Sequence, residues 1–213
     1  MQVSDVALVF EGGGTRNSYT APFVERLLRE DIDVGWVGGV SAGASHVVNY
    51  LSRDIQRSIN SFTDFIAQPA SSGWRPMLRG RGYFDAEYIY EDAGLPDGAM
   101  PLDYETFKNN PTPYRISAVR ADTGETINWG PDDIPDLPTL MKYTRASSTI
   151  PGVMRMPYID GVPFVDGALG SSGGIPIDAA EADGFKKFLI VLTRPKGFRR
   201  TTPCLLYTSP SPR

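Results

Sequence analysis

The 213-residue sequence predicts an α/β protein built on a mainly parallel sheet. Two observations predict this class. Within the first fifty residues, apolar runs and amphipathic stretches alternate as strand, helix, strand, helix, which is typical of parallel strands joined by right-handed crossovers. A glycine-rich segment also follows the first predicted strand, at the sheet edge where open α/β folds bind their ligands.

The first four elements follow from hydrophobic periodicity. Residues 6–10 form a short apolar run that stops at a glycine cluster, as a buried parallel strand does. Over residues 21–30, apolar side chains recur every three or four positions with charged side chains opposite, which predicts an amphipathic helix. A second strand is predicted over 36–40 and a second helix over 43–52.

The middle of the chain is less regular. Prolines and glycines interrupt residues 68–110, which predicts an insertion with short helices that could cover a site. Residues 114–119 and 125–129 predict a β-hairpin. A helix that begins near Pro138 is predicted over 137–146.

The remaining elements complete one predicted domain over residues 1–200. Residues 153–158 and 162–165 predict a strand pair with its turn at Asp160 and Gly161. A last apolar strand is predicted over 188–192. Residues 201–213 contain three prolines and no hydrophobic period, so we expect a tail that is disordered or foreign to the fold.

Composition limits the partners and the location of the protein. A net charge of -4 offers no basic surface for a phosphate backbone, which disfavours nucleic acid as a partner. Cys204 is the only cysteine, so an intramolecular disulfide and a cysteine-rich metal site are excluded. Residues 1–10 lack a secretory signal pattern, and no apolar stretch is long enough to span a membrane. We therefore expect a cytoplasmic protein that meets membranes only peripherally.

Ser41 is a candidate nucleophile. Gly39, Ser41 and Gly43 form the pattern G-x-S-x-G between a predicted strand and a predicted helix. This context predicts a sharp turn, where the glycines let neighbouring backbone approach and the serine Oγ projects from the carboxyl end of the sheet. The same residues also fit a serine that caps a helix beside turn glycines, so the pattern alone leaves both roles open.

A glycine cluster follows the first predicted strand. Gly12, Gly13 and Gly14 can turn their N–H groups toward one point and bind an oxyanion near Ser41. Nucleotide-binding loops do not fit, because Asn17 replaces a required glycine and no Gly-Lys-Ser/Thr follows. Arg16 either orients this loop or is a surface cation, and we favour the first role.

The sequence contains one histidine, which restricts the base available to a serine nucleophile. His46 is five residues after Ser41 on the same predicted helix, rotated by roughly 140° and displaced by about 7.5 Å along the axis. We expect it to pack against the helix or lie in solvent. Asp166, which ends an apolar run and precedes Gly167, is the carboxylate candidate, although the Asp-Gly pair by itself is better explained as a solvated turn.

Together, these motifs resemble those of the patatin-like phospholipase family. The family's G-G-G-x-R matches residues 12–16, its G-x-S-x-G matches 39–43, and its D-G-A/G matches 166–168, in the same order. Residues 145–151 and 191–194 also resemble bacterial members. The resemblance covers residues 6 to about 200.

The resemblance implies a three-layer α/β/α sandwich and the hydrolysis of lipid or phospholipid acyl esters without a metal or cofactor. The site residues that it implies are Ser41 and Asp166 as a catalytic dyad, Gly12, Gly13 and Gly14 as an oxyanion hole, and Arg16, Gly39, Gly43 and Gly167 as supporting residues.

Two departures from the family pattern motivate an alternative. Asn17 stands where the family often has glycine, and family members usually continue past the strand at 188–192. The alternative is a catalytically silent module of the same fold that binds lipid or a partner.

Residues 70–90 carry more bulky apolar side chains than a solvated loop needs, interleaved with three arginines. Packing of the insertion onto the core explains most of them. For Trp74, Met77 and Leu78, contact with a membrane interface is a second hypothesis.

Overall fold

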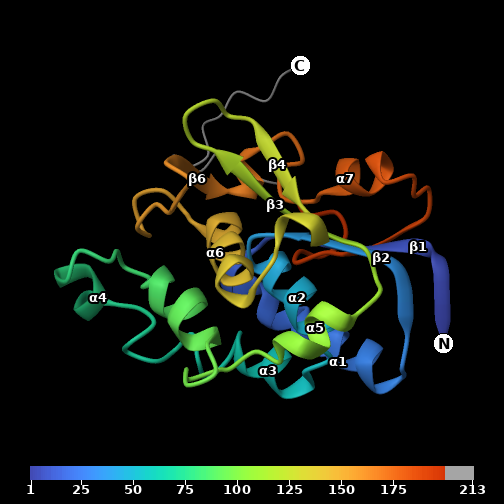
Figure 1. Cartoon of the computed structure of the whole chain (residues 1–213), viewed down its shortest axis with the longest axis horizontal. Helices are drawn as coiled ribbons and strands as arrows, with labels where there is room; N and C mark the ends of the chain where they lie inside the picture. The colour runs from blue at the N-terminus through green and yellow to red at the C-terminus, as the bar shows by residue number, and fades with distance from the viewer. Residues whose placement is uncertain (200–213) are drawn as a thin grey trace.

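The computed structural model describes residues 1–199 as a seven-stranded sheet flanked by helices (Figure 1). The sheet has the order β5-β6-β3-β2-β1-β7, and β4 pairs with β3 off this path. The strands are β1 (Gln2–Phe10), β2 (Asp33–Val40), β3 (Tyr114–Arg120), β4 (Thr126–Trp129), β5 (Tyr158–Ile159), β6 (Val162–Asp166) and β7 (Phe188–Val191). The tail predicted at 201–213 lies outside the described residues.

Helices of different lengths connect most of these strands. The α-helices are α1 (Ala21–Arg29), α2 (Ala42–Leu51), α3 (Ile55–Asn60), α4 (Trp74–Leu78), α5 (Tyr104–Asn109), α6 (Leu137–Ser148) and α7 (Ile177–Ala182). The 3-10 segments are η1 (Gly14–Tyr19), η3 (Pro131–Asp133) and η4 (Gly167–Leu169), and η2 (Glu87–Asp92) is a π-helical segment.

The sheet is parallel from β3 through β2 and β1 to β7, and antiparallel among β3, β4, β5 and β6. β3, β2, β1 and β7 are parallel neighbours, whereas β4 and β6 both pair antiparallel with β3, and β5 with β6. Ala118 of β3 pairs with Ile127 of β4 and also with Asp166 of β6. Since β4 occupies one edge of β3, β6 must share the other edge with β2.

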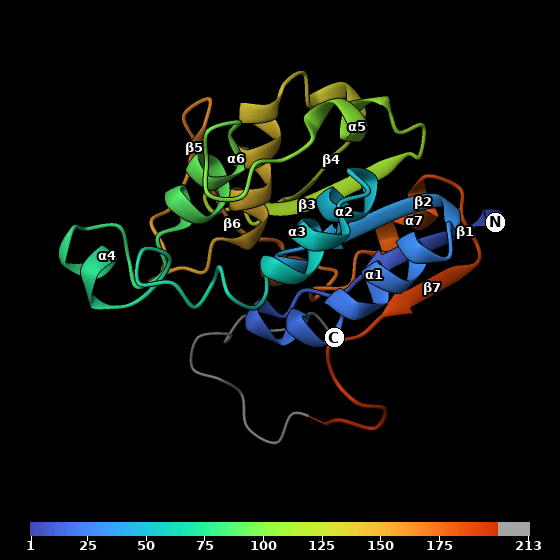
Figure 2. The same ribbon diagram turned by 90° about the horizontal axis from the view of Figure 1, so that it is seen from below.

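The two faces of the sheet bury different residues, as strand alternation requires. Leu8 and Phe10 of β1 belong to the larger core cluster, which α1, α2 and α6 complete. Ala7 and Val9 belong to a smaller cluster with Ala179 and Ala180 of α7. Figure 2 shows α1, α2 and α3 together on one side of the strands, with α7 beyond the sheet. The α/β/α layering is thereby confirmed.

Most predicted elements are present with small changes of boundary. The strands predicted at 6–10, 36–40 and 188–192 are β1, β2 and β7, and the predicted hairpin is β3 and β4. Helix α6 begins as expected near Pro138, where the Asp136 side chain accepts a 2.8 Å hydrogen bond from the Thr139 N–H. Helix α3, capped by Asp54, was not anticipated.

The prediction of a strand over 153–158 is wrong. Strand β5 contains only Tyr158 and Ile159. The preceding backbone bonds to the insertion instead of to the sheet, because the Val153 carbonyl accepts a hydrogen bond from Phe84 and Met154 bridges to Gly82. The predicted turn is present, and Asp160 (φ 50°) and Gly161 (φ 80°) have the positive φ values of a type I′ hairpin turn.

The insertion at 68–110 contains the short helices that the sequence predicted. Its distal part, with α4, projects from the body in both views (Figures 1 and 2). Its proximal part is held by Arg145 of α6, whose guanidinium lies 3.3 Å from Glu87 and 2.5 Å from Glu91. Within residues 1–199, no helix is long and apolar enough to cross a membrane, and no group of three or more His, Cys, Asp or Glu side chains could hold a metal ion.

Candidate active site

The topology of the sheet brings Ser41 and Asp166 together. Val40, the last residue of β2, pairs with Ser117, and Asp166, the last residue of β6, pairs with Ala118. The two strands therefore run toward each other along one edge of β3. Ser41 follows β2 directly, so its side chain emerges where β6 ends.

A hydrogen bond joins the two side chains. The Ser41 Oγ donates to Oδ2 of Asp166 at 2.6 Å, and the Ala168 N–H donates to Oδ1 at 2.8 Å. Ser41 and Asp166 are 6% and 3% exposed, so this bond is largely shielded from water. The serine hydroxyl and the carboxylate thus have the relative position that proton transfer between them requires.

The backbone at Ser41 has the strained geometry that the G-x-S-x-G pattern predicts. Its φ is 58° and its ψ is -130°, a combination that costs a non-glycine residue about 1 to 3 kcal/mol. The flanking glycines are needed for close approach. A Cβ on Gly39 would lie 2.3 Å from the carbonyl oxygen of Gly43, and one on Gly43 would lie 2.4 Å from that of Phe10.

Ser147 holds this turn in place, and the sequence analysis did not assign it a role. Its Oγ accepts a 2.9 Å hydrogen bond from the Ser41 N–H and donates a 2.7 Å bond to the Ser117 carbonyl. The side chain thereby links α6 to the end of β2 and to β3. The only signal in the sequence was its place within residues 145–151, which resemble bacterial patatin-like proteins.

Burial raises the pKa of Asp166 from 3.8 to about 6. Desolvation of the carboxylate is the main cause, and the hydrogen bonds from Ser41 and Ala168 oppose it. A carboxylate with this pKa is ionised at neutral pH and is a stronger base than an exposed aspartate. It has the affinity for a proton that a general base at neutral pH needs.

The glycine loop lies directly against the serine. A Cβ on Gly12 would be 3.1 Å from the Ser41 Cβ, so a larger residue there would crowd the serine. The Gly12 N–H donates to the Gly174 carbonyl at 2.9 Å and is therefore engaged. In the part of the chain that the structure describes, the N–H groups of Gly13 and Gly14 have no acceptor, and the positive φ of Gly14 (58°) turns the loop at this point.

Asn17 and Arg16 are integrated into the loop. Asn17 is fully buried and donates through Nδ2 to the Glu11 carbonyl at 3.0 Å. Arg16 donates to the Thr193 hydroxyl at 3.4 Å, and that hydroxyl donates to Glu11 at 2.9 Å. Arg16 therefore connects the loop to the segment that follows β7, whereas Asn17 ties the loop to the residue that follows β1.

His46 packs in the interior, as expected. It is fully buried between the rings of Phe10 and Phe62, and its Nε2 lies 2.7 Å from the Thr20 hydroxyl. Burial lowers its pKa to about 3, so the imidazole is neutral. Its hydrogen bond is to Thr20, whereas the Ser41 hydroxyl is bonded to Asp166.

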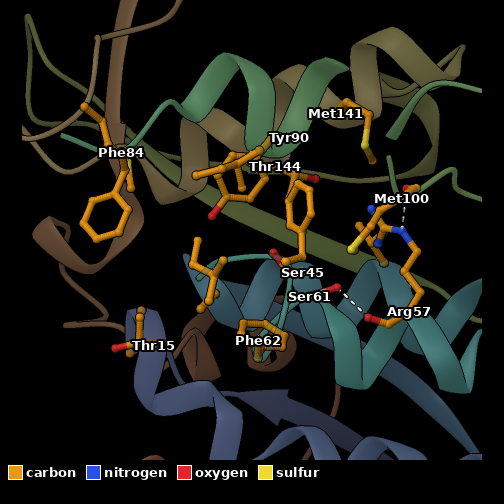
Figure 3. A pocket seen from close by; sticks show the side chains of 18 of the residues that line it. Thr15, Ser45, Arg57, Ser61, Phe62, Phe84, Tyr90, Met100, Met141 and Thr144 are labelled. Atoms are coloured by element: carbon orange, nitrogen blue, oxygen red, sulfur yellow. Dashed lines mark hydrogen bonds between the residues drawn. The ribbon is translucent and has the colours of Figure 1, made fainter. Parts of the chain in front are cut away.

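A cavity of about 260 Å³ adjoins the glycine loop. Gly14 and Thr15 are exposed at one end, and Met100, Arg57 and the buried Met141 line the other (Figure 3). Most side chains between these ends are apolar. Such a lining suits a hydrocarbon chain better than a charged or sugar-like ligand.

Tyr90 adds a polar group to this cavity. It stands on η2 and lines the wall together with Ser45 of α2 (Figure 3). Burial raises the pKa of its phenol, and the nearby hydroxyls of Ser148 and Ser45 oppose this shift. The sequence analysis placed Tyr90 among the apolar residues of 70–90 and missed its position near Asp166.

Comparison with known proteins decides the family. The sequence profile described as patatin-like phospholipase matches residues 8–181. The chain belongs to the patatin-like phospholipase family. The matched range contains all three motifs of this patatin-like chain, including the Asp166 segment at its far end.

The patatin-like chain is similar to a bacterial relative and to a solved structure. The uncharacterized protein YjjU of Escherichia coli K12 is 26% identical over 216 aligned positions, which cover 98% of this chain and 55% of that protein. The chain thus spans about half the length of this relative. The crystal structure of VipD from Legionella pneumophila matches with a TM-score of 0.49 and 13% identity, over 77% of this chain and 46% of VipD.

Proposed function

We propose that this chain hydrolyses acyl esters of lipids, with Ser41 as the nucleophile and Asp166 as its base. The observation that carries the proposal is the 2.6 Å hydrogen bond from the Ser41 Oγ to Oδ2 of Asp166, on a strained turn beside a largely apolar cavity. Membership of the patatin-like phospholipase family supports the lipid substrate.

In the acylation step, the Ser41 Oγ attacks the ester carbonyl carbon while its proton moves to Asp166. The carbonyl oxygen becomes an oxyanion, and the free N–H groups of Gly13 and Gly14 are the donors best placed to stabilise it. The amino end of α2, which starts directly after Ser41, also favours this negative charge. The C–O bond to the alcohol then breaks, and the leaving alcohol takes the proton from Asp166.

Deacylation repeats these roles with water. Asp166 accepts a proton from a water molecule, which attacks the acyl carbon of the Ser41 ester. The same glycine N–H groups stabilise the second oxyanion. When that intermediate collapses, the fatty acid leaves and the proton on Asp166 returns to the Ser41 Oγ.

The acyl chain of the substrate is assigned to the cavity. Ala42, Ser45 and Val48 line it from one face of α2, and Met141 and Thr144 line it from α6. The amino end of α2, which follows Ser41, and the carboxyl end of α6, which contains Ser147, lie together at one end of the cavity, because the Ser41 N–H is bonded to Ser147. From Ala42 to Val48, α2 advances about 9 Å, which sets the length of chain that fits.

The test is hydrolysis of p-nitrophenyl esters by the parent, Ser41→Ala and Asp166→Asn. We expect both substitutions to lower kcat/KM by about 10³-fold or more, since each removes part of one proton-transfer unit. Ser4→Ala and Asp160→Asn are matched controls at exposed positions outside the site. Parent-like rates in either site variant would remove that residue from the mechanism.

A fluorophosphonate probe separates this proposal from the silent binding module. We expect the probe to label the parent at Ser41 and to leave Ser41→Ala unlabelled. A folded parent that binds lipid vesicles and resists labelling would support the silent module instead.

A further inference from the structure

Helix α4 presents three large apolar side chains to solvent. Trp74, Met77 and Leu78 are 72%, 51% and 86% exposed, whereas Pro76 is the buried residue of the helix. Their spacing of three and four positions puts them on one face of a helical turn. They lie on the part of the insertion that projects furthest from the sheet (Figures 1 and 2). Exposed apolar side chains do not stabilise the fold, so this face of α4 is suited to contact with an external partner.

An adjoining hollow gathers positive charge. Arg75, Arg79 and Arg81 line a surface hollow of about 360 Å³ together with Asp85. Arg81 is paired with Asp85 at 3.3 Å and lies 4.0 Å from Glu87. Arg75 and Arg79 form no ion pair within residues 1–199. The hollow is therefore basic on a chain whose net charge is -4.

The exposed apolar face of α4 and the arginine hollow are oriented so that both can contact one surface. At about 100° per residue, Trp74, Met77 and Leu78 centre on one direction around α4, and Arg75 and Arg79 centre roughly 120° away. Apolar side chains beside cationic side chains, at the tip of a projecting segment, form the arrangement with which interfacial helices enter a lipid surface.

We propose that α4 and this arginine hollow form a docking site for anionic phospholipid membranes, in which the arginines bind lipid phosphates while Trp74, Met77 and Leu78 enter the interface. The bound ligand is the phosphate-bearing headgroup of a membrane lipid. Charge complementarity selects this partner, because a headgroup phosphate supplies the acceptors that unpaired guanidinium groups require.

The location of the site connects docking with the cavity. The bridge Ser72–Phe84 closes the base of the α4 segment, and the bridge Gly82–Met154 joins this segment to the body. Phe84 and Met154 are also lining residues of the cavity. A lipid surface that held α4 would therefore lie close to the cavity, yet the docking site shares no residue with the proposed dyad.

The experiment measures binding of Ser41→Ala to vesicles, so that no lipid is hydrolysed. We expect cosedimentation with phosphatidylglycerol-containing vesicles, weak binding to pure phosphatidylcholine vesicles, and a blue shift of tryptophan fluorescence on binding. Adding Arg75→Gln and Arg79→Gln should weaken binding to the anionic vesicles by roughly fivefold for each arginine. In the Ser41→Ala background, Trp74→Ser, Met77→Ser and Leu78→Ser together should abolish most of the binding to anionic vesicles.

Matched controls are Arg26→Gln and Tyr19→Ser, which change an exposed arginine and an exposed aromatic residue elsewhere and should leave binding unchanged. Thermal unfolding midpoints of all variants show whether each is folded.

Equal binding to both vesicle types, parent-like binding of the α4 variants, or no vesicle binding would overturn the proposal. Abolition of vesicle binding by millimolar inorganic phosphate at constant ionic strength would also overturn it, in favour of a site for free phosphate. None of these outcomes depends on whether Ser41 is catalytic.

Discussion

The Ser41 hydroxyl is hydrogen-bonded to the Asp166 carboxylate at 2.6 Å, although 125 positions separate the two residues in the chain. The bond forms because β2 and β6 end on adjacent residues of β3, Ser117 and Ala118. It is buried, and Ser147 and Ala168 fix its two ends. Four predictions follow from this geometry and from the cavity beside it.

The first concerns pH. Since the pKa of Asp166 is raised to about 6, the carboxylate becomes protonated below that pH and can no longer accept the serine proton. We expect kcat/KM for a short soluble ester to fall about tenfold per pH unit below pH 6. The unfolding midpoint measured over the same range is the control for acid denaturation. Constant activity down to pH 5 would contradict the assignment.

The second concerns stability. Because the pKa of Asp166 is raised in the folded state, the carboxylate lowers stability as the pH rises from 3.8 to about 6, and this loss is complete at pH 7. A shift of this size corresponds to roughly 3 kcal/mol. Asp166→Asn should therefore be inactive yet about 1 to 3 kcal/mol more stable than the parent at pH 7 in urea unfolding. The gain should shrink below pH 4, and a large loss of stability at pH 7 would refute the argument.

The third concerns Ser147. Ser147→Ala removes both hydrogen bonds that hold the Ser41 turn, so we expect a loss of about 1 to 2 kcal/mol in stability. We also expect kcat to fall by roughly tenfold or more, because the serine is less well positioned. Ser58→Ala is a matched control, since Ser58 is fully buried and bonded to the Asp54 carbonyl far from the dyad. A parent-like kcat in Ser147→Ala would limit Ser147 to a structural role.

The fourth concerns the chain length of the substrate. An extended chain covers about 3.5 Å in three bonds, so the cavity's 9 Å path beside α2 holds about eight bonds. Beyond it the chain meets the Arg57 guanidinium, whose pKa burial lowers to about 10. We expect the parent to prefer p-nitrophenyl esters of about eight to ten carbons, because a longer chain would reach this partly buried cation.

Met141→Ala tests where the cavity ends. Met141 is 2% exposed, and its removal should move the preferred chain length upward by about two or three carbons, at a stability cost of roughly 2 to 5 kcal/mol. Met77→Ala, on the exposed face of α4, should leave the preference unchanged. An unaltered chain-length profile in Met141→Ala would place the acyl chain elsewhere.

Local features of the sequence were sufficient to predict most strands, the helices α1, α2 and α6, and the turn at Ser41. Glycines at 39 and 43 with a serine between a strand and a helix define a strained turn, because the required contacts lie within a few residues or in the adjacent strand. The single histidine could be excluded as the base from helix geometry alone. The short hairpin turn at Asp160 and Gly161 was predictable for the same local reason.

The tertiary structure decided what depends on pairing between distant segments. The shared edge of β3, the Ser147 contact and the engagement of the Gly12 N–H by Gly174 each join residues that the sequence does not relate. Residues 153–158 were predicted as a strand, yet the backbone of Val153 and Met154 pairs with the insertion, and no local propensity predicts that choice. Hydrophobic period and turn chemistry determine local conformation, whereas the partner of each backbone group and the position of each buried polar side chain depend on how the layers pack.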